Sequence, residues 1–269
     1  MSAPDVGATL YLLAHHDDEV FCAGRIWADL IAGRQVRLLW ATAGGLAPAG
    51  RRQAEGRRVA RLLDLPSGTA VSLGWPDQSA LSHLRQILEA ATWMLGEAGV
   101  TTADRVCAPA YEGGHPDHDA MNLVAARLRA RHPELRAEEF ALYRRGRSGC
   151  GGCGERRGHG ERGGHSGLAV KAPWLFSAIS PTSTAADPLP PAARALRRRL
   201  MTANTSQLPT SLGPLAALAL IQRTWASEPV RELPQHDYSK PPHEGRPLYE
   251  SYTRHRFSDF AAAAADFEK

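Results

Sequence analysis

The chain has 269 residues, of which 43% are hydrophobic, so it can bury the core of one large α/β domain but is too short for two. Its net charge of +4 arises in residues 144–170, where six arginines outnumber two glutamates, and the remainder is close to neutral. Because no basic face is interleaved with aromatic residues, we expect no nucleic-acid partner. No stretch approaches the roughly 18 apolar residues of a membrane span, and residues 1–5 lack the features of a signal peptide. A cytoplasmic location is therefore expected.

Short apolar runs alternate with helical patterns through the first half of the chain. Strands are expected at residues 9–14, 36–42, 70–73, 105–108 and 140–143. Helices are expected at residues 21–31, 51–65, 81–95 and 117–131, and Pro116 suits the first position of the last one. This alternation predicts an α/β fold in which a mostly parallel sheet carries helices on both faces.

The character of the chain changes after Tyr143. Residues 144–170 are rich in Gly and Arg and almost free of apolar residues, so we expect a disordered loop within a single domain spanning residues 1–269. Cys150 and Cys153 in this loop have the spacing of a zinc site but not its apolar support, and a shifted reading frame is another explanation of the segment. Beyond it, helices are expected at residues 192–203, 215–225 and 261–267, with loop and one short strand within 229–252.

The first chemically active cluster follows the first expected strand directly and consists of His15, His16, Asp17, Asp18 and Glu19. At the end of a strand, His15 and Asp18 can turn toward one point while Asp17 remains beside it. Imidazole and carboxylate groups are both ligands of Zn²⁺. A solvated loop with a helix-capping acid is the alternative interpretation. A nucleotide-binding dehydrogenase is disfavoured, because this acidic turn would repel its pyrophosphate.

The second cluster, GGHPDHD at residues 113–119, follows the strand expected at 105–108. His115 and His118 are three residues apart, so they can lie near the same side of a first helical turn. Histidine and aspartate are also common near helix starts, which is the simpler alternative. Functional groups of parallel sheets gather at the carboxyl ends of strands, and we therefore interpret the two clusters as one site.

Together the two clusters resemble the motifs of a known family. Residues 14–19 (AHHDDE) look like the Ala-His-Pro-Asp-Asp-Glu motif of the LmbE/PIG-L de-N-acetylases, which are N-acetylglucosaminyl deacetylase-like enzymes, and residues 115–118 match their His-Pro-Asp-His motif. Weaker likeness extends over residues 52–55, 74–77 and 237–250. The resemblance implies a Rossmann-like fold and a zinc-dependent hydrolase. His16 replaces the usual proline; it can occupy the same backbone region, but it could also offer a competing ligand or a substrate contact.

The resemblance also implies roles for individual residues. His15, Asp18 and His118 would bind one zinc ion per chain and leave positions open for water and substrate. Asp17 would be the general base that takes a proton from the zinc-bound water. His115 would stabilise the oxyanion as a cation, and Asp117 would hold it in that form.

The implied reaction removes an N-acyl group, above all N-acetyl, from an amino sugar or a sugar-containing metabolite. Arg52, Asp77 and Tyr111 are the candidate substrate contacts: Arg52 for a hydroxyl or phosphate, Asp77 for a sugar hydroxyl, and Tyr111 for the oxyanion. An exposed helical arginine and a turn-forming aspartate are the simpler alternatives for the first two. Two other functions remain open, a zinc amidase acting on a non-sugar amide such as an acylated cysteine conjugate, and a catalytically inactive sugar-binding relative.

Overall fold

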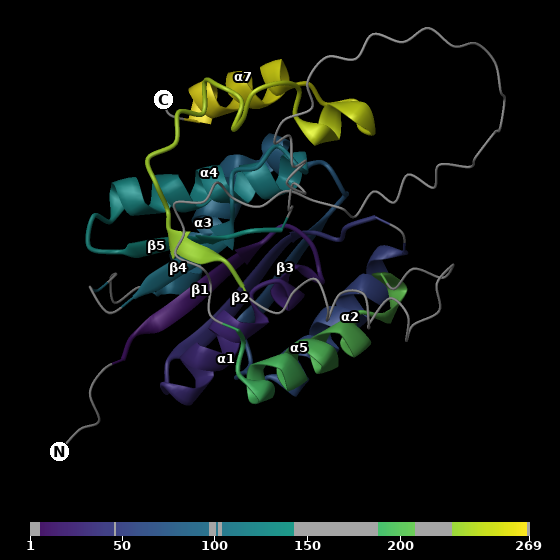
Figure 1. Cartoon of the computed structure of the whole chain (residues 1–269), viewed down its shortest axis with the longest axis vertical. Coiled ribbons are helices and arrows are strands. Elements are labelled where there is room, and N and C mark those ends of the chain that lie inside the picture. Colours follow the sequence, from purple (N-terminus) through teal and green to yellow (C-terminus); the bar gives the residue numbers. More distant parts are fainter. Residues whose placement is uncertain are drawn as a thin grey trace, which may run out of the picture.

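In a computed structural model the chain forms a central sheet between two layers of helices (Figure 1). The structure describes residues 6–45, 47–96, 101, 104–142, 188–207 and 228–267. The strands are β1 (Ala8–Leu13), β2 (Gln35–Thr42), β3 (Ala70–Trp75), β4 (Arg105–Pro109), β5 (Arg136–Phe140) and β6 (Val230–Glu232). They lie in the order β3-β2-β1-β4-β5-β6, and only β6 is antiparallel to its neighbour. The expected mostly parallel sheet is confirmed, in the strand order typical of Rossmann-like folds.

Helices cover both faces of the sheet. One layer contains α1 (Ala23–Ile31), α2 (Ala49–Leu62) and α5 (Pro191–Ala203), and the other contains α3 (Leu84–Leu95), α4 (Pro116–Arg131) and α7 (Phe257–Phe267) (Figure 1). The central strand β1 feeds both layers, since Leu10 and Leu12 join the core under α3 and α4, whereas Tyr11 and Leu13 join the core under α1 and α5. Burial on both faces explains why this strand reads as a continuous apolar run.

Short 3₁₀ turns adjoin several of the expected helices. The turn η1 (Asp18–Val20) precedes α1, and η2 (Ala80–His83) runs into α3. Two more, η3 (Thr205–Gln207) and η4 (Leu248–Ser251), follow α5 and precede α7. The helix expected at 215–225, the Gly/Arg-rich segment 144–170 and its two cysteines lie outside the described residues.

The fifth strand differs from the prediction, because β5 occupies Arg136–Phe140 rather than residues 140–143. Its sequence, RAEEF, carries charges that ordinarily mark an exposed loop. In the fold, Glu138 pairs with Arg25 at 2.8 Å and with Arg105 at 3.1 Å, and Glu139 is buried. Ion pairs with distant residues therefore stabilise a strand in a segment whose sequence lacks the alternation of apolar and polar residues.

Glu139 is the clearest source of pH-dependent stability away from the two motifs. Its carboxylate accepts hydrogen bonds from Arg231 (2.7 Å), Asn122 (2.8 Å) and His236 (2.9 Å). Burial raises the pKa of Glu139, but His236 and Arg231 lower it further, below its ordinary value. A carboxyl group whose pKa is lower in the folded state contributes stability above its unfolded pKa and loses it as pH falls.

We therefore expect Glu139→Gln to lower the free energy of unfolding at pH 7. The difference from the unaltered protein should shrink as pH falls from 7 to about 3, because the unfolded carboxyl group takes up its proton near its ordinary pKa of about 4.3. Urea unfolding at pH 7 and at about pH 3 measures this difference in the free energy of unfolding. Glu232→Gln, at an exposed position of the neighbouring strand β6, is the control. A Glu139→Gln difference that does not vary with pH would contradict this assignment.

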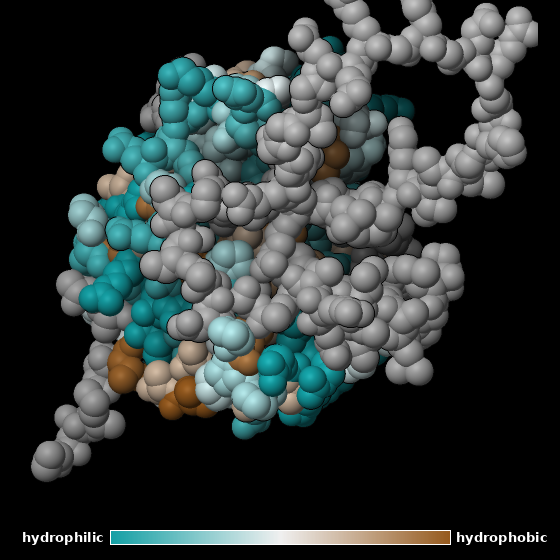
Figure 2. All heavy atoms as spheres, viewed as in Figure 1, coloured by the Kyte–Doolittle hydropathy of each residue, from teal (hydrophilic) through white to brown (hydrophobic). Residues whose placement is uncertain are grey.

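The surface of the described residues is largely polar, with hydrophobic residues in small patches in the view of Figure 2. Large exposed hydrophobic side chains in these ranges are limited to Ile31, Trp93, Leu248 and Tyr252. None of the helices described is both long enough and apolar enough to span a bilayer.

Candidate active site

The carboxyl ends of β1 and β4 lie side by side at the centre of the sheet. From β1 the chain continues to β2 on one side, and from β4 it continues to β5 on the other. The loops after these strands leave in opposite directions, and the crevice between such loops is where open α/β sheets bind ligands. His15 follows β1 and His115 follows β4, so the two sequence motifs meet at this crevice.

The three side chains predicted as metal ligands converge there. The Nδ1 of His15 lies 3.1 Å from the Nε2 of His118, which lies 3.2 Å from the Oδ1 of Asp18. One ligand atom from each residue lies within 4.8 Å of the others, and all three residues are buried. Two imidazoles and one carboxylate are a donor set that suits zinc.

Asp18 is held so that one carboxylate oxygen faces the histidines. Its Oδ2 accepts hydrogen bonds from the backbone N–H groups of Ala14 (2.8 Å) and His15 (2.9 Å), where β1 leads into η1. Burial raises the pKa of Asp18, but His118 and His15 lower it further, to well below its ordinary value. The carboxylate is therefore ionised at neutral pH, as a metal ligand must be.

His15 is oriented by two carboxylates on the far side of its ring. Its Nε2 lies 3.1 Å from the Oδ1 of Asp77 and 3.3 Å from the Oδ2 of Asp117. Burial lowers the pKa of His15, but the hydrogen bonds to Asp117 and Asp77 raise it above its ordinary value. In the neutral ring that a metal requires, the proton on Nε2 donates to these carboxylates and leaves the Nδ1 lone pair facing His118, an arrangement typical of metal-binding histidines. Asp77 thus lies in the site, in contact with His15.

Asp117 contacts a different partner from the one predicted. Its carboxylate accepts hydrogen bonds from the backbone N–H groups of Gln78 (2.7 Å) and Ala80 (3.0 Å), in addition to its contact with His15. Only its backbone N–H reaches His115, donating to the Nδ1 of the ring at 3.2 Å. Asp117 therefore fixes the loop that carries Asp77 and orients His15, and it does not hold His115 as a cation.

His115 caps the N-terminus of α4, and its ring accepts the capping hydrogen bond. Because its Nδ1 accepts a hydrogen bond, the proton of the neutral ring resides on Nε2, which lies 3.6 Å from the Oδ1 of Asp77. Burial, together with His15 and His118, lowers the pKa of His115 to about 3. The ring can therefore donate a hydrogen bond from Nε2 near neutral pH, and this geometry favours a neutral imidazole over the charged imidazolium that the family resemblance implies.

Asp17 lies beside the three ligand residues with an uncommon backbone conformation, φ +122°. Its N–H donates to the Oε2 of Glu19 at 3.1 Å, and its Oδ1 accepts a hydrogen bond from Arg52 at 2.9 Å. Burial, together with Asp18 and Glu19, raises the pKa of Asp17 to about 8, although Arg52 lowers it. The side chain is 30% exposed, so it can exchange a proton in the crevice near neutral pH.

Residues 10–128, which include both motifs, match the PIG-L family, described as GlcNAc-PI de-N-acetylase. The chain contains a PIG-L family domain. No curated protein matches the chain.

The chain also resembles solved structures in fold, two of which are deacetylases by their names. The zinc inhibited form of teicoplanin deacetylase Orf2 is 13% identical, with a TM-score of 0.54 over 84% of this chain and 98% of that one. The conserved protein TT1542 from Thermus thermophilus is 18% identical, with a TM-score of 0.54 over 88% and 99%. The N,N'-diacetylchitobiose deacetylase from Pyrococcus horikoshii is 14% identical, with a TM-score of 0.51 over 92% and 86%. At these identities the likeness shows the fold alone.

Arg52 of the PIG-L domain is fully buried, in contrast to the exposed or substrate-binding arginine considered from the sequence. Its guanidinium donates to the carbonyl of Ala43 (3.1 Å), to Glu55 (3.1 Å), to Ser206 (3.3 Å) and to Asp17 (2.9 Å). The structure gives Arg52 no surface for a substrate, and its charge is used to hold Asp17.

Replacing Arg52 should strongly destabilise the protein, because the buried carboxylate of Glu55 would lose its closest ion pair (3.1 Å) and keep only the longer contact with the exposed Arg51 (3.9 Å). We expect Arg52→Met to lower the free energy of unfolding by about 3–5 kcal/mol, the cost of breaking a buried ion pair. The same substitution at Arg57, which is exposed on the same helix, should change it by no more than about 0.5 kcal/mol. Equal effects in urea unfolding would show that the buried network does not stabilise the fold.

Two other residues singled out from the sequence make their contacts away from the three predicted ligand residues. Tyr111 is 6% exposed, packs at 5.4 Å from the ring of Phe260, and donates its hydroxyl to the carbonyl of Lys240 at 2.8 Å. It belongs to the core under α7, not to the predicted oxyanion site. His16 is buried against Trp40, and its Nε2 lies 3.0 Å from the Oγ of Ser72, so its ring does not compete as a ligand.

Sequence patterns did not reveal two residues that help to build the site. Asn204, just after α5, donates a hydrogen bond to the Oε1 of Glu19 at 2.5 Å and so stabilises the loop of the first motif. Tyr252 donates its hydroxyl to the carbonyl of Gly114 at 2.5 Å, beside His115. Both lie far along the chain from the motifs they contact, and the weak family likeness over residues 237–250 was the nearest signal for the second.

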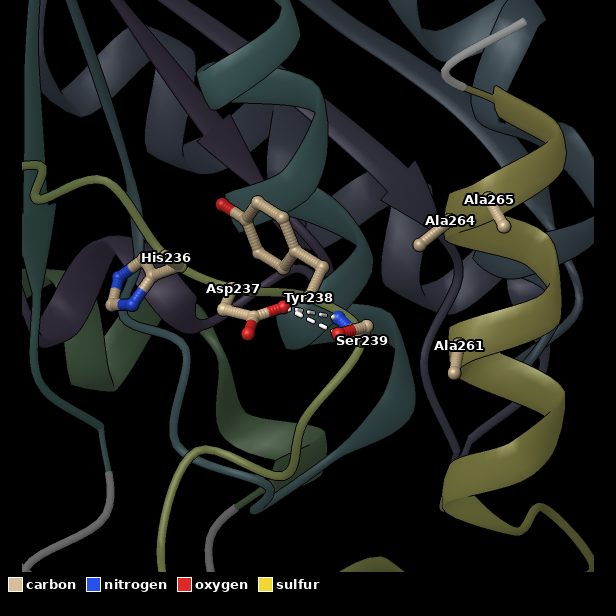
Figure 3. Close-up of a pocket in the computed structure, with 7 residues that line it drawn as sticks. All are labelled: His236, Asp237, Tyr238, Ser239, Ala261, Ala264 and Ala265. Atoms are coloured by element: carbon tan, nitrogen blue, oxygen red, sulfur yellow. Dashed lines mark hydrogen bonds between the residues drawn. The ribbon is translucent and has the colours of Figure 1, made fainter.

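A pocket of about 290 Å³ lies elsewhere, between the segment before η4 and the helix α7 (Figure 3). Its lining residues are His236, Asp237, Tyr238, Ser239, Ala261, Ala264 and Ala265. The carboxylate of Asp237 accepts hydrogen bonds from the backbone and hydroxyl of Ser239, drawn as dashed lines. The pocket shares no residue with the two motifs, so we assign the chemistry to the crevice.

Proposed function

We propose that the protein is a zinc-dependent hydrolase that removes an N-acyl group, most simply N-acetyl, from an amino sugar or a sugar-containing metabolite. The observation that carries the proposal is the convergence of His15, Asp18 and His118, with the raised-pKa carboxyl group of Asp17 beside them. The PIG-L family match supports the deacetylase chemistry.

The ligand residues fit a zinc ion in chemistry and in spacing. Neighbouring ligand atoms of a tetrahedral zinc are about 3.3 Å apart, as follows from bond lengths near 2.0–2.1 Å. The distances from the Nε2 of His118 to His15 and to Asp18 are 3.1 Å and 3.2 Å. Three protein ligands leave a coordination position open, as a catalytic site requires. We propose one zinc ion per chain.

When bound, zinc would supply Lewis-acid chemistry, by polarising the amide carbonyl and making a water molecule more acidic. Asp17 takes the proton from the attacking water and later returns it to the nitrogen of the leaving amine. The Nε2–H of His115 donates a hydrogen bond to the oxyanion that develops on the carbonyl oxygen. Arg52 keeps the carboxylate of Asp17 in place, and in this proposal Asp77 accepts a hydrogen bond from a sugar hydroxyl.

The proposed substrate class is inferred from deacetylases of similar fold, and a panel of candidate substrates tests it. The solved deacetylases of similar fold act, by their names, on teicoplanin and on N,N'-diacetylchitobiose, which supports a glycosylated substrate. The panel pairs N-acetylglucosamine and its glycosides with an acetylated cysteine conjugate, and acetate release is measured. Zinc is added in stoichiometric amount, because teicoplanin deacetylase Orf2 has a zinc inhibited form.

The proposed function predicts acetate release from a sugar substrate, abolished by a chelator and restored by zinc. Release from the cysteine conjugate alone would identify an amidase for non-sugar amides. Binding of the sugars without release would indicate an inactive sugar-binding relative, and would overturn the enzymatic proposal.

A further inference from the structure

The C-terminal part of the chain forms one wall of the candidate active site. The carbonyl of Gly113 accepts hydrogen bonds from the backbone N–H groups of Leu248 (2.7 Å) and Tyr249 (3.4 Å). A Cβ atom added at Gly113 would lie 3.1 Å from Pro242 and 3.2 Å from Pro247. This glycine, with φ +65°, therefore admits the close approach of the segment around η4 to the loop that carries His115.

Tyr252 is the aromatic side chain that this wall presents beside the site. Its hydroxyl is anchored on the carbonyl of Gly114 at 2.5 Å, and its ring centroid lies 6.3 Å from that of His115. The residue is nevertheless 51% exposed. A tyrosine that is fixed at its polar end and about half exposed is pre-organised for stacking, because little conformational entropy remains to be lost.

Asp77 also lies close to His115. Its Oδ1 lies 3.6 Å from the Nε2 of His115, and its side chain is 29% exposed. An aromatic ring and an accessible carboxylate thus each lie near His115, the residue that we assign to the oxyanion. A pyranose ring needs both, because it has an apolar face of C–H groups and a rim of hydroxyl groups. A long acyl chain would instead need a continuous apolar lining.

We propose that Tyr252 determines substrate specificity by stacking against the pyranose ring of the amino sugar, with Asp77 accepting a hydroxyl. This inference rests on the proposed function and narrows its substrate to cyclic sugars. The ring takes no part in bond breaking, so its loss weakens binding and leaves the chemical step unchanged once substrate is bound.

The test is calorimetric binding of methyl N-acetylglucosaminide to the full-length, zinc-loaded protein that carries Asp17→Asn, in which turnover does not interfere. Adding Tyr252→Leu, which keeps apolar bulk without the ring, should raise Kd about tenfold, the size of a strong aromatic contact. Tyr252→Phe keeps the ring and should stay within about threefold. Trp93→Ala, at an exposed aromatic of α3, is the matched control and should not change Kd.

A second readout separates stacking from a structural role. In the otherwise unaltered protein, Tyr252→Leu should raise KM and preserve kcat. An unchanged Kd in Tyr252→Leu, an equal loss in Trp93→Ala, or no binding of the glycoside by any variant would overturn the role of Tyr252. The proposed hydrolase activity is judged separately, by acetate release from the substrate panel.

Discussion

Asp17→Asn is expected to bind zinc as the unaltered protein does and to lose most of its turnover. The substitution keeps the size of the side chain and an oxygen that can accept the hydrogen bond from Arg52. It removes the group that takes the proton from water, and loss of a general base typically costs about 10²–10⁴-fold in rate. Zinc content and kcat, measured on the same preparation, test both parts of this expectation.

Asp64→Asn is the matched control for this variant. Asp64 is exposed at the end of α2 and, like Asp17, has a positive φ, +52°. Asparagine and aspartate both tolerate such backbone conformations better than most residues. The control should therefore report any cost of the substitution itself, and we expect full activity. Full activity in Asp17→Asn as well would remove Asp17 from the role of base.

Asp18→Ala is expected to lose the metal together with the activity. Its Oδ1 faces His118 at 3.2 Å, and its Oδ2 satisfies two backbone N–H groups at the end of β1. Zinc affinity should fall by more than about 100-fold, since that is the upper range for residues that only orient a ligand. Asp18→Asn, which retains an oxygen for the backbone N–H groups, should also bind zinc weakly if the first variant folds poorly.

Asp104→Ala controls for the loss of a buried backbone anchor. Asp104 accepts hydrogen bonds from the N–H groups of Ala8 (2.7 Å) and Thr101 (2.8 Å) at the opposite end of β1. Its replacement should reduce stability and leave zinc binding intact. Zinc affinity that stays the same in both Asp18 variants would show that the ligand set is wrong.

The parts of the fold that could be predicted are those with a strong local pattern. The run before His15 is apolar at every position because β1 is buried on both faces, and the start of α4 is marked by Pro116. Since β1 and β4 are neighbours, the two motifs had to meet once the strands had been recognised. The convergence of the ligand residues followed from that.

The parts that could not be predicted depend on partners that are distant in sequence. Arg52 lies in a helix with a charged pattern, and only the fold buries it against Asp17. The position of β5 could not be predicted for the same reason. Glu138 and Glu139 give this segment a charged sequence, and their arginine partners lie elsewhere in the chain. Distance in sequence also misleads for two tyrosines. Tyr111 is close to the second motif in sequence but packs in the core, whereas Tyr252 is distant in sequence and lies beside His115.

The zinc content of the purified protein tests the central claim most directly. Protein prepared without added zinc, and again after reconstitution, is analysed by elemental mass spectrometry alongside Asp18→Ala. The account predicts about one zinc per chain for the unaltered protein and almost none for the variant. No zinc in the unaltered protein, even after reconstitution, would contradict the assignment of His15, Asp18 and His118 as a catalytic metal site.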